Sequence, residues 1–75
     1  MKDYHINIFY SDDDECYVAD IPDLTFCSAF GETPEEALGN VEKAKKAWIE
    51  TAISEGKEIP APHYRPVTSH AAHRP

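Results

Sequence analysis

The sequence predicts an α+β fold, an antiparallel three-stranded sheet with a possible fourth edge strand and one long helix packed on one face. Residues 4–10 alternate in side-chain character, and residues 15–21 are apolar on both faces; both runs are rich in aromatic and β-branched residues, as strands are. Residues 26–30 form a shorter run of the same kind. Residues 34–55 follow a helix-start signal and repeat apolar residues at helical spacing.

The first two strands are predicted to form a hairpin. In residues 4–10 one face carries Tyr4, Ile6, Ile8 and Tyr10. The polar break at residues 11–14 is short, so the second strand, residues 15–21, must run antiparallel to the first. This second strand is apolar on both faces, with Tyr17, Ala19 and Ile21 on one and Cys16 and Val18 on the other.

The helix is the best-marked element. Pro22 and Asp23 end the second strand, and Gly31 ends the third. Thr33 is the expected N-cap, Pro34 stands at the first helical position, and Glu36 completes a capping box. Gly56 is the expected left-handed cap after Glu55, which gives a helix of about 22 residues, or roughly 33 Å.

The helix stripe and one strand face together predict the core. Its members are Ile6, Ile8, Tyr17, Ala19, Leu38, Val41 and Trp48. Lys45 projects into the apolar arc, and we expect its stem to pack on the sheet while the ammonium reaches solvent without a specific ion pair.

The chain is expected to form one domain over residues 1–62, followed by a Pro- and His-rich tail over residues 63–75. An edge strand at residues 63–68 is an option, because Pro66 restricts it to an edge, and disorder is expected beyond it.

Charge and apolar content exclude several classes of function. Fourteen acidic and seven basic residues give a net charge of −7, which disfavours direct nucleic-acid binding and favours a basic partner. No apolar run approaches the ~18 residues of a membrane span. The start of the chain has no secretory h-region, so we expect a cytoplasmic protein in which Cys16 and Cys27 are reduced and buried.

No set of residues predicts catalysis, a metal or a cofactor. Asp12, Asp13, Asp14 and Glu15 lack the EF-hand spacing and are expected to be solvated. His63, His70 and His73 fall in the tail and are expected to be disordered rather than metal ligands. Cys16 and His5 could form a thiol pair on adjacent strands, but no third group orients the base.

Three motifs resemble the HicB-like antitoxin family. They are YVADIPDL at residues 17–24, Cys27, and GETPEEALGN at residues 31–40, in the order and at the spacing typical of that family. The similarity continues through Trp48 to the Pro-rich end near residue 62. The chain departs from the pattern at Thr25 and Phe26, where the family usually has Pro-Gly. Because Phe does not adopt positive φ cheaply, we expect a different turn there.

The resemblance implies a partial RNase H-like domain that neutralises a small basic HicA-like toxin that cleaves mRNA. Many members also carry a C-terminal DNA-binding segment, and we expect none here. The acidic residues Asp12, Asp13, Asp14 and Glu15 are the expected toxin-binding site. The alternatives are an orphan homo-oligomeric domain of structural or ligand-binding role, and a degenerate RNase H-like enzyme that would depend on Asp20 or Asp23.

Self-association is expected on physical grounds. One helix covers one side of a sheet, so the other side would expose apolar side chains as a patch of the kind that marks interfaces. We expect a homodimer, or a tetramer built from dimers, through the uncovered sheet face or its edge strand. The predicted contact residues are Phe9, Cys16 and Val18.

Overall fold

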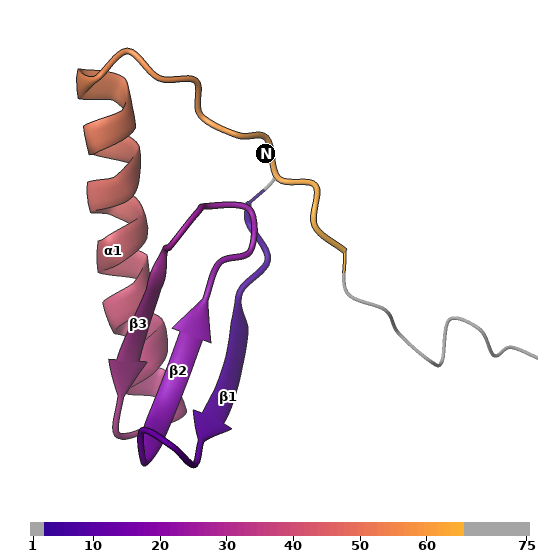
Figure 1. Ribbon diagram of the computed structural model, residues 1–75, viewed down its shortest axis with the longest axis vertical. Helices are drawn as coiled ribbons and strands as arrows, with labels where there is room; N and C mark the ends of the chain where they lie inside the picture. Colours follow the sequence, from indigo (N-terminus) through magenta and orange to yellow (C-terminus); the bar gives the residue numbers. More distant parts are fainter. Residues whose placement is uncertain (1–2, 66–75) are drawn as a thin grey trace, which may run out of the picture.

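Three strands and one helix follow one another along the chain in the computed structural model, which describes residues 3–65 (Figure 1). The strands are β1 (Asn7–Ser11), β2 (Cys16–Asp20) and β3 (Ser28–Gly31), and the helix is α1 (Pro34–Ser54). The predicted α+β class, with an antiparallel three-stranded sheet and one long helix, is confirmed. The strands are shorter than the apolar runs that predicted them.

The sheet has the order β1-β2-β3, and both pairs are antiparallel. Ile8 stands opposite Ala19, and Tyr10 stands opposite Tyr17, so these four side chains share a face. The ring centroids of Tyr10 and Tyr17 are 5.2 Å apart in an edge-to-face arrangement. Phe9, Val18 and Phe30 form a cross-strand row on the opposite face.

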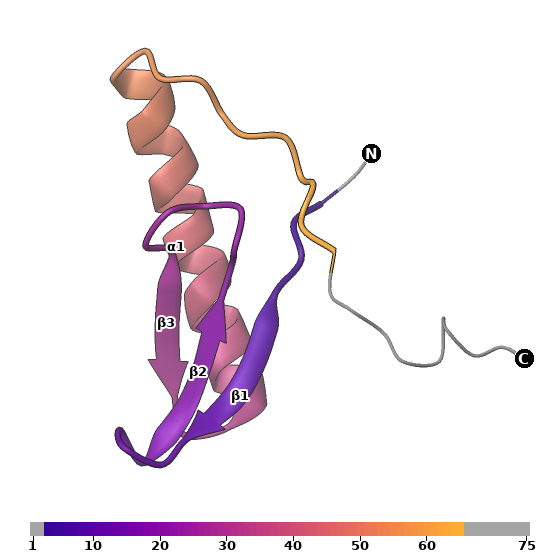
Figure 2. The same ribbon diagram turned by 45° about the vertical axis from the view of Figure 1, so that its right-hand side comes forward.

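The helix covers β2 and β3 and leaves most of β1 uncovered. Figures 1 and 2 show α1 running along β3 and behind the sheet, with β1 at the opposite edge from β3, and α1 contacts β1 far less than the other strands. A single helix about 10 Å wide cannot cover three strands spaced about 4.8 Å apart with their side chains. The helix therefore packs on β2 and β3, and β1 remains exposed to solvent on both faces.

The core lies between α1 and the β2–β3 half of the sheet. Its buried members are Ala19, Ile21, Leu24, Cys27, Ala37 and Val41, with Ile6, Tyr17, Leu38 and Trp48 packed against them. Six of the seven predicted core residues are thus in place. The prediction for Ile8 is wrong, because its side chain is 39% exposed on the uncovered strand.

The connection from β2 to β3 is a hydrogen-bonded turn in which Leu24 and Cys27 are buried and Thr25 and Phe26 are exposed. The N–H of Leu24 donates to the Ile21 carbonyl (3.1 Å), the N–H of Cys27 to the Leu24 carbonyl (3.1 Å), and the N–H of Ile21 to the Cys27 carbonyl (3.0 Å). Phe26 has a φ of 61° within this turn. The expectation that Phe26 would avoid positive φ is therefore wrong, since these three bonds hold the turn in place.

The helix begins and ends as local signals dictate. The Glu36 N–H donates to the Thr33 hydroxyl (3.0 Å), and the Glu36 carboxylate accepts from the Glu32 N–H (2.6 Å), one residue earlier than the capping box predicts. At the other end Gly56 has a φ of 72°, and its N–H donates to the Ile53 carbonyl (3.0 Å). The helix has 21 residues and ends at Ser54, one residue before the expected end.

After the helix, residues 57–65 form an extended segment, the C-terminal strap, that crosses to the start of β1 (Figure 1). The Tyr4 hydroxyl donates to the Pro60 carbonyl at 2.5 Å. His63 to Arg65 are not part of a strand, and the rest of the predicted edge strand lies outside the described residues.

The Lys45 ammonium forms an ion pair, contrary to the expectation that it stays unpaired. Its Nζ lies 3.2 Å from Oδ1 of Asp3. The backbone N–H of Tyr4 and this ammonium together lower the pKa of the Asp3 carboxyl. The pair ties the beginning of the chain to the helix.

Within residues 3–65 no helix combines the length and the apolar character that crossing a membrane requires.

Candidate partner-binding surfaces

The four adjacent acidic residues lie in the turn between β1 and β2, at one end of the sheet. Asp12, Asp13, Asp14 and Glu15 are all exposed. The Ser11 hydroxyl donates to Oδ2 of Asp14 (3.0 Å), and the Asp14 N–H lies 3.3 Å from the same hydroxyl oxygen. Glu15 has a φ of 54°. Asp14 and Glu15 thus shape the acidic turn, while Asp12 and Asp13 have no protein partner among the described residues.

The sheet face away from the helix carries the predicted self-association residues. Phe9 is 51% exposed, Val18 is buried between its neighbours in the row, and Phe30 lies at the other end. Cys16 is half-buried, contrary to the expectation that both cysteines are buried. Phe30 was not predicted as part of this surface. Pairing of β3 with β2 could have identified it. Gly31 stands opposite Tyr17, so Phe30, one residue earlier, stands opposite Val18 and shares its face.

Phe26 is a second exposed aromatic residue that was not predicted as part of a surface. Its side chain is 98% exposed, and it borders an open groove of about 530 Å³ between the β2–β3 turn and α1. Trp48 lines the same groove and donates its Nε1–H to the Thr25 carbonyl (3.0 Å). A left-handed, solvent-exposed Phe is costly to keep, and such positions concentrate at functional sites.

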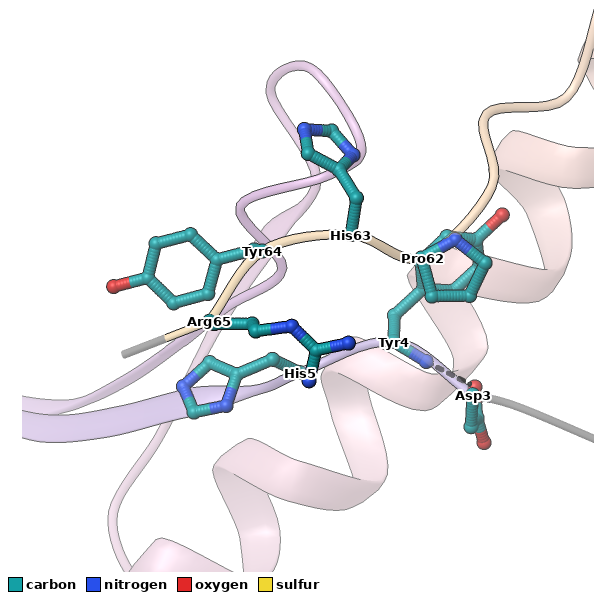
Figure 3. A pocket seen from close by; sticks show the side chains of 7 residues that line it. All are labelled: Asp3, Tyr4, His5, Pro62, His63, Tyr64 and Arg65. Atoms are coloured by element: carbon teal, nitrogen blue, oxygen red, sulfur yellow. Dashed lines mark hydrogen bonds between the residues drawn. The ribbon is translucent and has the colours of Figure 1, made fainter. Parts of the chain in front are cut away.

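A second cleft, of about 380 Å³, lies between the start of the chain and the C-terminal strap (Figure 3). The His5 and Tyr64 rings are in contact at a tilt of 44°, with ring centroids 5.0 Å apart, and the Arg65 side chain lies across the cleft beside His5 (Figure 3). The cleft brings the Arg65 guanidinium and the His5 and His63 imidazoles together with the Asp3 carboxylate, at the end of the sheet opposite the acidic turn.

Asp23 anchors the strap. Its side chain is 2% exposed, and its carboxylate accepts the N–H groups of His63 and Tyr64, each at 3.2 Å. The His63 Nδ1 lies 2.9 Å from Oδ1 of the same carboxylate. Asp23 is therefore engaged in a structural role, which leaves the degenerate-nuclease alternative without one of its two carboxylates.

The other candidate chemistry is not assembled. His5 precedes the Asn7 end of β1, whereas Cys16 pairs with Ser11 at the other end, so the thiol and the imidazole are held apart. The His5 ring instead lies 2.6 Å from Oδ1 of Asn7. No three metal-ligating side chains gather within residues 3–65. His70 and His73 lie outside the described residues.

Comparison with known proteins gives a family. The family model for the HicB-like antitoxin of bacterial toxin–antitoxin systems matches residues 4–73. The chain is 36% identical over 64 residues to the UPF0150 protein Ta0767 of Thermoplasma acidophilum, which covers 85% of this chain and 93% of that protein. It is also 42% identical over 45 residues to the UPF0150 protein ssl0259 of Synechocystis, covering 60% and 62% of the two chains. No solved structure gives a significant match.

Proposed function

The chain belongs to the HicB-like antitoxins of bacterial toxin–antitoxin systems, and we propose that it binds and neutralises a small basic HicA-like toxin that cleaves mRNA. The role we infer is that of a cytoplasmic binding protein rather than an enzyme. The partial RNase H-like relationship of the domain is part of the same proposal. A net charge of −7 supports a basic protein partner and disfavours direct contact with nucleic acid.

The acidic turn is the observation that carries this proposal. Four consecutive carboxylates stand at the tip of a hairpin, exposed and on a backbone fixed by Ser11 and by the β1–β2 ladder. Fixed charges of one sign steer a basic partner and raise the rate of encounter. The contact residues we propose are Asp12, Asp13, Asp14 and Glu15. Among residues 3–65 the Asp14 carboxylate is hydrogen-bonded to Ser11, and the other three carboxylates have no protein partner.

The test uses the small basic protein encoded by a neighbouring reading frame as the candidate toxin. We expect Asp12→Asn/Asp13→Asn to slow association several-fold in stopped-flow or surface-plasmon measurements, and added salt to reduce the difference, because exposed charges are screened within about 8 Å at physiological ionic strength. In an mRNA-cleavage assay this variant should require more antitoxin for the same inhibition.

A matched control changes the same number of charges elsewhere. Glu42→Gln/Glu50→Gln removes two exposed carboxylates from α1 and should leave association nearly unchanged. If both double variants weaken binding equally, overall charge and not the acidic turn recruits the toxin. If neither does, the toxin docks on another surface.

Self-association is the second part of the proposal. The row of Phe9, Val18 and Phe30, with Cys16 beside it, supports an interface between copies at Phe9, Cys16 and Val18. A domain of this size buries only about 60% of its unfolded surface and gains from a partner. Sedimentation at micromolar concentration is the measurement, and a chain that stays monomeric on concentration contradicts it.

A further inference from the structure

The outer edge of β1 is an unprotected sheet edge. β1 is first in the order β1-β2-β3, so one side of its backbone has no strand partner. Its residues, Asn7–Ser11, include no charge and no proline, the features that natural proteins use to prevent edge strands from pairing. Within residues 3–65 no side chain hydrogen-bonds to the backbone of Ile8, Phe9 or Tyr10.

The other edge of the sheet is protected. β3 has only four residues, and the Asn40 side chain of α1 donates its Nδ2–H to the Phe30 carbonyl at 2.7 Å. The helix also lies along this side of the sheet (Figure 2). The two edges therefore differ, and β1 is the edge available to another strand.

β1 also exposes three consecutive large apolar residues. Phe9 and Tyr10 are each 51% exposed, and Ile8 is 39% exposed. Ile8 and Tyr10 point to the helix side of the sheet, where α1 leaves them exposed, and Phe9 points to the opposite face. A strand that pairs with β1 would shield apolar side chains on both faces at once.

We propose that β1 pairs antiparallel with β1 of a second copy, about a two-fold axis at Phe9, to form a continuous six-stranded sheet. In this register Phe9 faces Phe9 of the second copy, and Ile8 faces its Tyr10. The row of Phe30, Val18 and Phe9 then continues unbroken into the same row of the other copy. This inference rests on the self-association part of the proposed function and is independent of the toxin.

Charge selects this orientation. In the antiparallel register the acidic turns of the two copies are separated by six residues along the paired strands, which is about 20 Å at about 3.4 Å per residue. Parallel pairing would place the two turns side by side. The antiparallel register points the acidic turn of each copy toward the other copy's chain start, the end where Arg65 lies and where Asp3 is already paired with Lys45 (Figure 3). For a chain of charge −7, an arrangement that separates the two acidic turns and sets each toward the end that carries Arg65 is favoured.

Disulfide cross-linking distinguishes edge pairing from stacking of the open faces. In a Cys16→Ser background, Ile8→Cys/Tyr10→Cys should give a cross-linked dimer on mild oxidation, because each new thiol faces its counterpart across the paired edge. The single variant Tyr10→Cys is the matched control and should cross-link far less, since its thiols are two residues out of register. Both positions are exposed, so the core is unaffected, and circular dichroism confirms that the variants are folded.

Sedimentation of the unmodified chain, read together with the cross-linking results, shows which part of the proposal is wrong if the expected dimer is not found. A dimer that cross-links at Phe9→Cys but not at the 8/10 pair shows stacked faces and overturns edge pairing, while self-association stands. A Tyr10→Cys variant that cross-links as well as the double variant overturns the register. A chain that remains monomeric overturns both edge pairing and self-association.

Discussion

Gly31 and Ala37 lie so close that a Cβ on Gly31 would stand 2.4 Å from the Ala37 backbone nitrogen. This contact joins the end of β3 to the first turn of α1. The obstructing atoms belong to the backbone of a capped helix, so they cannot rotate away. We expect Gly31→Ala to destabilise the domain by about 3 kcal/mol or more, because overpacking against fixed atoms forces the elements apart. Urea denaturation measures the loss.

Gly39 provides the control for this substitution. It lies inside α1, and a Cβ there meets nothing within 4 Å. Gly39→Ala should stabilise the domain by about 0.5–1 kcal/mol through helix propensity alone. If Gly31→Ala is as harmless as Gly39→Ala, the close approach of β3 to α1 is wrong.

Trp48 joins α1 to the β2–β3 turn by packing and by one hydrogen bond to the Thr25 carbonyl. Trp48→Phe keeps most of the packing and loses the bond, so we expect a cost of about 1 kcal/mol. Trp48→Ala should cost about 3 kcal/mol, the low end for a buried aromatic, because the side chain is only partly buried. Thermal melts should rank the two variants in that order, and equal losses would mean that the hydrogen bond, rather than the packing of the ring, accounts for the whole contribution of Trp48.

Phe26 predicts a stabilising substitution. Its φ of 61° costs a non-glycine residue about 1–2 kcal/mol, and its fully exposed side chain contributes little packing. Phe26→Gly should therefore raise stability by up to about 1 kcal/mol, after the entropy that glycine gains in the unfolded chain. Phe26→Ala retains the unfavourable φ and should give no gain. Equal effects of the two variants would show that the side chain and not the backbone matters.

Local signals predicted the helix and the strand order. Thr33, Pro34 and Gly56 act within a few residues of where they stand in the sequence, so their effect can be read without the fold. The short turn after Ser11 likewise fixes an antiparallel hairpin. The acidic turn was placed correctly at its tip for the same reason, although its role in binding stays a prediction.

What sequence reasoning missed depends on contacts between distant segments. Asp23 is read locally as a turn residue, and its partners His63 and Tyr64 lie 40 and 41 positions away. Phe26 takes a left-handed φ because the hydrogen bonds of the β2–β3 turn require it. Ile8 has the correct alternation for the core, but only the position of α1 on the sheet decides that its strand is uncovered.

Substitution of Asp23 is predicted to release the C-terminal strap. Its buried carboxylate accepts two backbone N–H groups, and in Asp23→Asn an amide replaces one acceptor oxygen with a donor. We expect a loss of about 1.5–3 kcal/mol, as for hydrogen bonds to a charged group, and faster hydrogen exchange at the amides of His63 and Tyr64. Asp13→Asn, in the exposed acidic turn, is the control and should change neither quantity. His63→Ala leaves the backbone bonds intact and should have only a small effect, because the ring is 82% exposed.

Cys27 predicts a difference in thiol reactivity and an alkaline loss of stability. Burial, and after it the carboxylate of Asp20, raises the pKa of the Cys27 thiol. Because the thiolate is the reactive form, iodoacetamide should modify Cys27 much more slowly than half-buried Cys16 at pH 8, as mass spectrometry can follow. A thiol whose pKa is higher in the folded state favours folding fully below the ordinary thiol pKa of about 8.5, and this contribution is lost as pH rises through the raised value. The urea midpoint of Cys16→Ser, which retains Cys27, should fall from pH 8 to pH 10 more than that of Cys16→Ser/Cys27→Ala. Equal falls would show that ionisation of Cys27 is not coupled to folding. Tyr4, whose pKa is also raised by burial, contributes to the loss common to both variants.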